Sequence, residues 1–183
     1  MSYFRDNIER MAGYVPGKQL PGQNIIKLNT NENPFPPTPK IKEFLTTLHN
    51  NLDILKKYPD PISTPVRETI ASIYNFEPNN IITGNGSDDI LTIAIRSFVG
   101  EGEAISVLSP SYSLYNVLAD IQGAKVVEVP LTETFELPSN ILQVIDGSKI
   151  LFLTSPNAPT ANQFPKNEII NICKNFSGIV FID

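Results

Sequence analysis

Short apolar runs alternate with helical patterns along the chain from about residue 78 onward. Runs with the composition of strands lie at residues 81–83, 104–108, 125–129, 149–153 and 179–183. Helical patterns fill the gaps, at residues 88–99, 112–121, 138–145 and 166–175. Runs such as Ile-Leu-Phe-Leu contain no alternating polar residues, which is typical of strands covered on both faces. Helices of this length join parallel neighbours, so the pattern predicts an α/β fold with a doubly wound, mostly parallel sheet.

The first 65 residues follow a different pattern, because nine of the sixteen prolines lie there and interrupt any regular ladder or helix. We therefore expect an irregular N-terminal arm with one short strand at residues 25–28. Two helices are predicted at residues 39–50 and 65–74, because each begins with a proline after a threonine cap.

Composition and charge exclude several classes of function. The net charge of −5 and four scattered arginines give no basic surface for a nucleic acid. One cysteine and one histidine exclude a disulfide framework and a Cys-rich or multi-histidine metal site. The helical pattern around Cys173 predicts a core thiol. No run of 18 apolar residues occurs and the N-terminus has no apolar signal core, so we expect a cytoplasmic protein without a membrane partner.

Glycine-rich and polar segments follow four of the five predicted strands, where ligands of parallel sheets bind. The first, Gly-Asn-Gly-Ser-Asp-Asp at residues 84–89, joins a strand to the N-terminus of a helix. Free N–H groups and the helix dipole favour an anion there, and Ser87 adds a hydroxyl, so this segment is a candidate phosphate site. A tight turn with Ser87 or Asp88 as helix cap is an equally good interpretation. Asp89 stands where a dinucleotide fingerprint needs its third glycine.

Three further residues follow the ends of other strands. Tyr112 could stack on a planar cofactor, although a half-buried aromatic residue is the simpler interpretation. Asn157 lies in a proline-bounded loop and could donate to a ligand oxygen, or it is a turn residue. Asp183 follows four apolar residues, where a carboxylate is costly unless it meets a cation or good donors. Alternatively it is an exposed chain end.

Several motifs together resemble those of a known family. They are Leu-Asn-Thr-Asn-Glu-Asn-Pro at 28–34, Tyr-Pro-Asp at 58–60, Gly-Asn-Gly-Ser-Asp-Asp at 84–89, Pro-Ser-Tyr at 110–112 and Ser-Pro-Asn-Ala-Pro-Thr at 155–160. Their order and spacing are similar to those of histidinol-phosphate aminotransferases, fold type I enzymes that use pyridoxal 5′-phosphate. The resemblance spans nearly the whole chain and about the first half of a typical family member.

The resemblance implies a role for each candidate residue. It implies that Gly86, Ser87 and Asp88 hold the cofactor phosphate, and that Tyr112 stacks on the pyridine ring. The carboxylate of Asp183 would pair with the ring nitrogen and keep it protonated.

Further roles follow from the same resemblance. Tyr14 would lie over the substrate. Asn157 would contact the cofactor through a small shift of its loop, in place of the neighbouring Ala158, where family members have the contacting asparagine. Tyr58 would reach the phosphate of a neighbouring subunit's cofactor, which implies a homodimer. An N-terminal arm and small-domain segment would occupy residues 1–50, and an incomplete cofactor-binding large domain residues 51–183.

Two departures from the family pattern limit these expectations. Ala158 stands where family members have an asparagine that meets the cofactor's phenolic oxygen, and Ala161 replaces the following glycine. The lysine that forms a Schiff base with the cofactor is expected beyond Asp183, and no lysine within the sequence is a suitable replacement. We therefore expect an N-terminal piece of a longer enzyme, inactive by itself.

The functional hypothesis is a transfer of the amino group between histidinol phosphate and 2-oxoglutarate in histidine biosynthesis. A related threonine-phosphate decarboxylase or aromatic aminotransferase is an alternative, because these families share the later motifs. A non-catalytic cofactor-binding fragment or pseudoenzyme is another, favoured by the absent lysine. A nicotinamide-dependent dehydrogenase is disfavoured by Asp89.

Overall fold

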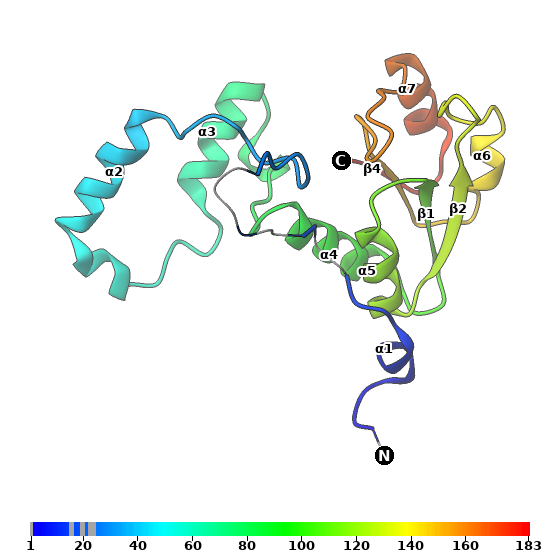
Figure 1. Ribbon diagram of the computed structural model, residues 1–183, viewed down its shortest axis with the longest axis horizontal. Coiled ribbons are helices and arrows are strands. Elements are labelled where there is room, and N and C mark those ends of the chain that lie inside the picture. The colour runs from blue at the N-terminus through cyan, green and yellow to red at the C-terminus, as the bar shows by residue number, and fades with distance from the viewer. Residues whose placement is uncertain (1, 15–16, 19–20, 22–24) are drawn as a thin grey trace. The chain divides into compact units, whose positions relative to one another are not determined.

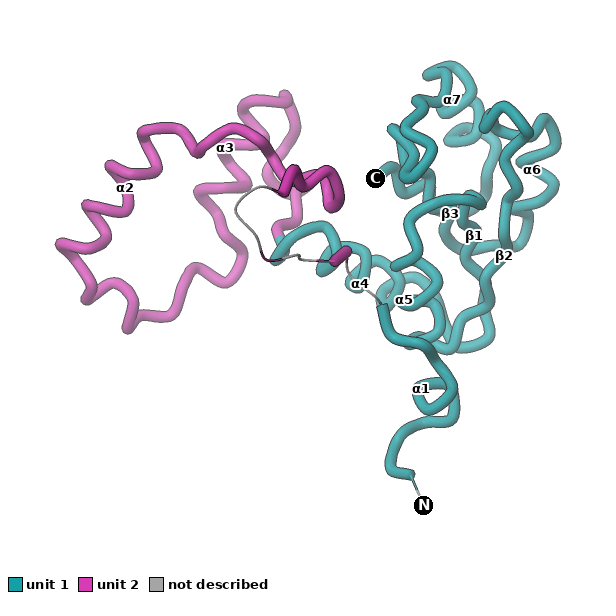
Figure 2. The backbone as a smooth tube through the Cα atoms, viewed as in Figure 1, with its two compact units in different colours: residues 1–14, 84–183 teal, residues 15–83 magenta. Residues whose placement is uncertain are grey.

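The computed structural model describes residues 2–14, 17–18, 21 and 25–183. The chain divides into two compact units (Figure 2). Unit 1 contains Met1–Tyr14 and Gly84–Asp183, and unit 2 contains Val15–Thr83. The predicted boundary at residue 50 concerns the domains of the family fold and stays a prediction.

A four-stranded parallel sheet forms the centre of unit 1, in the order β2-β1-β3-β4 (Figure 1). The strands are β1 (Ala104–Ser109), β2 (Lys125–Pro130), β3 (Ile150–Leu153) and β4 (Ile179–Ile182). Both neighbours of β1 run parallel to it, so Val107 pairs with Glu128 on one side and Phe152 on the other. All four residues of β3 are buried, as predicted for an unbroken apolar run. The similar run of β4 is not covered in this way, because β4 is at the edge of the sheet and two of its four residues are exposed.

Helices cover both faces of this sheet. The helices of unit 1 are α1 (Asp6–Arg10), α4 (Ser87–Phe98), α5 (Leu114–Gln122), α6 (Ile141–Val144) and α7 (Lys166–Asn175). One core packs Leu91 of α4 and Leu118 of α5 against Ile150 of β3. The other packs Ile141 of α6 and Ile172 of α7 against the opposite face. The fold is therefore a doubly wound α/β sheet, as the sequence predicts.

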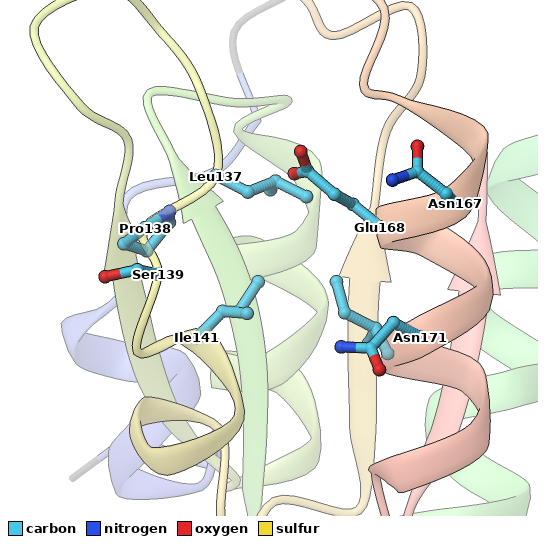
Figure 3. A pocket seen from close by; sticks show the side chains of 8 residues that line it. Leu137, Pro138, Ser139, Ile141, Asn167, Glu168 and Asn171 are labelled. Atoms are coloured by element: carbon cyan, nitrogen blue, oxygen red, sulfur yellow. The ribbon is translucent and has the colours of Figure 1, made fainter.

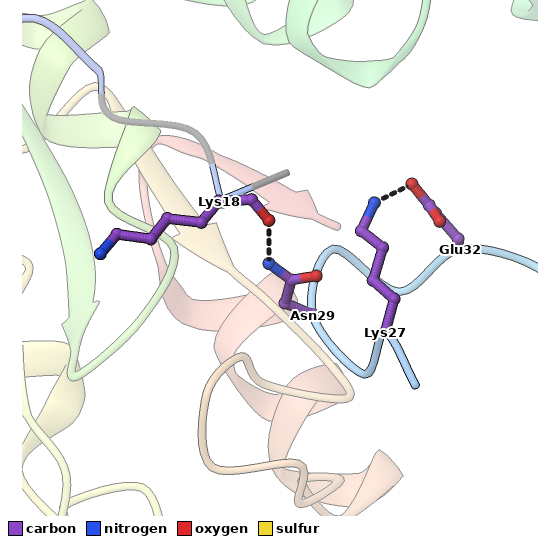
Figure 4. A network of polar contacts seen from close by, with 4 residues as sticks. All are labelled: Lys18, Lys27, Asn29 and Glu32. Atoms are coloured by element: carbon purple, nitrogen blue, oxygen red, sulfur yellow. Dashed lines mark hydrogen bonds and ion pairs between the residues drawn. The ribbon is translucent and has the colours of Figure 1, made fainter. Parts of the chain in front are cut away.

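The described residues of unit 2 form helices and loops. Its elements are α2 (Pro39–His49), a 3-10 turn η1 (Leu52–Lys56), α3 (Thr64–Tyr74) and a second 3-10 turn η2 (Pro78–Asn80). Polar contacts hold its loops. Lys27 forms an ion pair with Glu32, and the Asn29 side chain donates to the Lys18 carbonyl oxygen at 3.0 Å (Figure 4).

Some sequence expectations were wrong in detail. Residues 25–28 and 81–83 form no strand, because neither segment pairs with a strand of the β2-β1-β3-β4 sheet. The sheet therefore has four strands, whereas the pattern from residue 78 onward predicted five. Cys173 is exposed, since α7 turns Ile172 toward the core instead. Among the described residues, none of the helices combines the length and the apolar character needed to cross a membrane.

Candidate functional site

The candidate site lies at the carboxyl ends of β1, β3 and β4. The chain passes from β1 to β2 on one side of the sheet and later places β3 on the other side of β1. Loops that leave β1 and β3 therefore diverge, and the crevice between them is where doubly wound sheets bind ligands. Tyr112 follows β1, Asn157 follows β3 and Asp183 follows β4, so the topology brings these three positions to one edge.

The turn before α4 supplies a helix N-terminus that faces open space. Gly86 has φ +87° and ψ 173°, a conformation that only glycine adopts without strain, and nothing lies within 4 Å of where a Cβ would stand. Gly86 is the N-cap residue of α4 and has no side chain, so it forms no capping hydrogen bond to the N–H groups of the first turn. The Asp89 carboxylate turns back to accept the Asn85 N–H at 3.0 Å. A phosphate is a suitable partner for such a turn.

Tyr112 links this turn to the rest of the site. Its phenol donates to Asp88 Oδ1 at 3.4 Å, a long contact, and the ring of Tyr14 meets its ring edge-on at a centroid distance of 6.1 Å. Burial raises the pKa of Tyr112 well above its usual value, and the neighbouring Tyr14 phenol and Asp88 carboxylate raise it further. The phenol is therefore neutral at physiological pH. The structure brings Asp88, Tyr112 and Tyr14 together.

Tyr115 joins Tyr112 to Asp183, and the sequence analysis missed it. The Tyr115 ring lies edge-on to Tyr112 at 5.5 Å, and its phenol donates to Asp183 Oδ2 at 2.6 Å. Tyr115 stands three positions after Tyr112, and both lie within the helix predicted at residues 112–121, although α5 itself begins at Leu114. The i, i+3 spacing of that predicted helix could have indicated a shared face. The side chain is fully buried, with 0% exposed.

Asp183 is fixed at the end of β4 through its backbone. Its N–H donates to the Leu153 carbonyl at 3.2 Å, and its carbonyl accepts the Ser155 N–H at 2.9 Å. These bonds extend the β3–β4 ladder by one step past the ends of the two strands. The carboxylate thus stands at the edge of the sheet with one oxygen held by Tyr115.

Asn157 is 1% exposed and holds two loops together. Its Nδ2 donates to the Pro110 carbonyl at 2.9 Å and to Thr160 Oγ1 at 2.8 Å, and its Oδ1 accepts from Ser111 Oγ at 2.9 Å. Both amide hydrogens are therefore used within the protein, and one lone pair of Oδ1 is left for a further donor. The predicted contact of Asn157 with a cofactor stays a prediction.

Two other predicted positions lie differently. Tyr58 belongs to unit 2 and its side chain is fully exposed. Ala161 has φ +61°, in the left-handed region where the family pattern has glycine. That backbone conformation explains why glycine suits the position, although alanine stands there in this chain.

A pocket of about 380 Å³ lies on the other side of the sheet, between the segment before α6 and helix α7 (Figure 3). Leu137, Ile141 and Ile172 form its apolar wall, and Asn167 and Glu168 stand at its rim. None of the predicted site residues lines it, and its one charged lining residue is an acid. A phosphate-bearing ligand is therefore better matched to the turn before α4.

Comparisons with known proteins identify the family of this chain. The sequence pattern of the family described as aminotransferase class I and II matches residues 23–183. A histidinol-phosphate aminotransferase of Geobacter sp. (strain M21) is 46% identical over the whole chain, and the chain covers 51% of that protein. A histidinol-phosphate aminotransferase of Rippkaea orientalis is 41% identical over 98% of the chain, which covers 50% of it. The chain thus spans about half the length of the curated relatives it matches.

A solved structure shares the fold. The histidinol-phosphate aminotransferase of Sinorhizobium meliloti, crystallised in complex with pyridoxal 5′-phosphate, superposes with a TM-score of 0.84 at 19% identity. The match covers all of this chain and 51% of that one. At this identity the likeness supports the fold alone.

Proposed function

Because this chain belongs to the aminotransferase class I and II family, we propose that its protein transfers an amino group between histidinol phosphate and 2-oxoglutarate, with glutamate as the other partner and pyridoxal 5′-phosphate as cofactor. The observation that supports pyridoxal phosphate as the cofactor is the unbroken series of contacts from Asp88 through Tyr112 and Tyr115 to Asp183. The choice of substrate is supported by two relatives at 46 and 41% identity, which are named histidinol-phosphate aminotransferase.

The side chains at this edge have the chemistry that the cofactor needs. The N–H groups at Gly86, Ser87 and Asp88 would receive its phosphate, since an anion matches a helix N-terminus. Tyr112 would cover one face of the ring, and Asp183 would meet the ring nitrogen. When bound, pyridoxal phosphate supplies a ring that withdraws electrons from the substrate carbon.

The chain's own residues do the positioning. The Asp183 carboxylate holds a proton at the ring nitrogen, because a negative charge beside that nitrogen favours its charged form. Tyr112 excludes water from the ring face, and Tyr14, in contact with Tyr112, borders the substrate side. Asn157 ties the loops after β1 and β3 together and so keeps both walls of the crevice in place.

We also propose a homodimer in which Tyr58 contacts the phosphate held by the other subunit. Its fully exposed phenol is available for such a contact. A cytoplasmic location is supported by the single cysteine, which cannot build a disulfide framework.

The test uses the complete gene product, loaded with pyridoxal phosphate and supplied with 2-oxoglutarate. Histidinol phosphate should yield glutamate at least ~10-fold more efficiently than phenylalanine, since a phosphate-reading site discriminates strongly. A preference for phenylalanine would favour the aromatic aminotransferase. Release of carbon dioxide from threonine phosphate would favour the decarboxylase, and cofactor binding without turnover would favour a non-catalytic binding protein.

Asp183→Asn tests the site itself. The amide cannot stabilise a protonated ring nitrogen by charge, so we expect kcat/KM to fall by ~100-fold or more. Asp146→Asn is the matched control, because Asp146 is exposed in the loop after α6 and should leave turnover unchanged. Equal activity of the two variants would remove Asp183 from the proposed site.

A further inference from the structure

The Tyr115 side chain is fixed by burial and by two aromatic neighbours. Its side chain is fully buried, its ring stacks on Phe152 at a centroid distance of 4.7 Å and 12°, and the Tyr112 ring meets it edge-on. Two aromatic neighbours therefore fix the direction in which the phenol points. That direction is toward Asp183 and Thr154, beyond the ends of β4 and β3.

The donor and the acceptor of each hydrogen bond around Tyr115 follow from the two ends of the series, Asn157 and Asp183. Asn157 Nδ2 donates to the Pro110 carbonyl, which can only accept, so the orientation of the amide is fixed. Asn157 Oδ1 is then an acceptor, and Ser111 Oγ donates its single proton to it at 2.9 Å. Ser111 has no second proton for its other contact, with Thr154.

The other end is fixed by Asp183. A carboxylate oxygen accepts, so the Tyr115 phenol donates its single proton to Asp183 Oδ2 at 2.6 Å. Burial, followed by the hydrogen bond to Asp183, raises the pKa of Tyr115 well above its usual value. The phenol therefore keeps the proton that it donates across the physiological range.

The proton of Thr154 completes the series. Its hydroxyl lies 2.7 Å from the Tyr115 oxygen and 3.2 Å from Ser111 Oγ, and both oxygens have a free lone pair to accept it. The shorter contact takes the proton, so Thr154 donates to Tyr115 and Tyr115 donates to Asp183. Hydrogen bonds in series polarise one another, which strengthens the last donor.

We propose that Tyr115, with Thr154 behind it, is a positioning residue that orients the Asp183 carboxylate toward the cofactor's ring nitrogen, an inference that rests on the function proposed above. With Oδ2 occupied by the phenol, Oδ1 is the oxygen that meets the ring nitrogen. Asp183 is exposed, so loss of the phenol replaces an oriented hydrogen bond with mobile water and frees the carboxylate to rotate. The ring nitrogen would then lose a fixed charge partner.

The experiment compares variants of the complete gene product with pyridoxal phosphate labelled isotopically at its ring nitrogen. Tyr115→Phe removes the hydroxyl and keeps the ring on Phe152, and Thr154→Val removes the second hydroxyl at nearly constant volume. Tyr3→Phe is the matched control, because the Tyr3 side chain is fully exposed. The readouts are the dissociation constant of the cofactor and the nitrogen NMR shift of the ring as a function of pH.

Tyr115→Phe should weaken cofactor binding by ~10-fold and move the ring nitrogen toward its unprotonated shift, as expected for the loss of one hydrogen bond to a charged group. Thr154→Val should act in the same direction by ~2-fold to 3-fold, and Tyr3→Phe should match the unmodified protein. If Tyr115→Phe does not fold, Thr154→Val decides alone.

Two results would overturn the inference in different ways. A lower melting temperature with unchanged affinity and unchanged nitrogen shift would show that Tyr115 is merely structural, while the proposed function stands. Failure of the unmodified protein to bind pyridoxal phosphate would reject the proposed function and this inference with it.

Discussion

The two units of this chain are stabilised in different ways. In unit 1, Leu151 and Phe152 are 0% exposed between two layers of helices. In unit 2, Phe44 is 62% and Leu45 54% exposed, and Ala71 is the one buried residue among those described. Burial of apolar surface is the main favourable term in folding, so unit 1 carries its own driving force.

Unit 2 depends instead on local polar contacts. The Arg67 guanidinium donates to the carbonyls of Pro78 and Ile81 at 2.7 and 2.8 Å, which ties α3 to the following turn. Asp60 accepts the N–H groups of Ile62 and Thr64 at 3.1 and 2.9 Å, which fixes the entry to α3. Such bonds specify a conformation and each contributes little net stability. A sheet with two cores and a helical unit without one should therefore respond differently to mutation and to pH.

The largest expected difference is in core truncation. Leu151→Ala should lower the free energy of unfolding of unit 1 by about 2–5 kcal/mol, because it removes buried methyl groups and leaves a cavity. Leu45→Ala on α2 should cost less than about 1 kcal/mol, since the side chain is already half in water. Chemical denaturation followed by circular dichroism measures both. Equal losses would contradict the contrast between the units.

Backbone strain at Gly86 should give the next largest effect. Gly86→Ala forces a Cβ onto a φ of +87° and should destabilise unit 1 by about 1–3 kcal/mol. Gly13→Ala is the control, because its Cβ would also meet nothing within 4 Å and its φ is outside the left-handed region. Thermal unfolding of the two variants isolates the backbone contribution. Indistinguishable melting temperatures would mean that the turn before α4 relaxes without cost.

Arg67→Met should loosen unit 2 by about 1–3 kcal/mol, because two carbonyl oxygens lose a charged donor. Hydrogen exchange at residues 78–83 should accelerate, while exchange in β1 and β3 stays unchanged. Arg96→Met on the exposed side of α4 serves as the control. Faster exchange in the sheet strands would show that the two units unfold together.

The smallest effect concerns pH. Hydrogen bonds from Thr64 and Ile62 hold the pKa of Asp60 below its usual value near 4. A lowered pKa in the folded state means that the contribution is present above the usual value and is lost as pH falls below it. The start of α3 should therefore fray in acid before the sheet does, and Asp60→Asn should remove that pH dependence. Backbone NMR at Ile62 and Thr64 measures both, and identical acid profiles for the two proteins would reject the assignment.

The sequence predicts the elements of unit 1 well because their signal is local. Residues 166–175 form a helix with the predicted bounds, and four apolar runs form strands. Residues 25–28 and 81–83 have the same local signal and form no strand, because a strand also needs a partner that composition does not reveal.

The candidate site was predictable at the level of loops and less so at the level of contacts. Parallel strands bring their carboxyl ends to one edge, so Tyr112, Asn157 and Asp183 could be grouped from the order of elements alone. Spacing could place Tyr115 near Tyr112, but not its contact with Asp183, since an aromatic ring gives the pattern of a core residue and its hydroxyl becomes significant only beside Asp183. The internal hydrogen bonds of Asn157 depend in the same way on Pro110, 47 positions earlier.

The strand order also affects how the chain folds during its synthesis on the ribosome. β3 pairs with β1 on one side and with β4 on the other, so one edge of a fully buried strand stays unpaired until residues 179–182 have been synthesised. Exposed edges of apolar strands invite association with other chains. A pause in translation between residues 153 and 179 would prolong that interval, and chaperones that bind extended apolar segments should meet this nascent chain there.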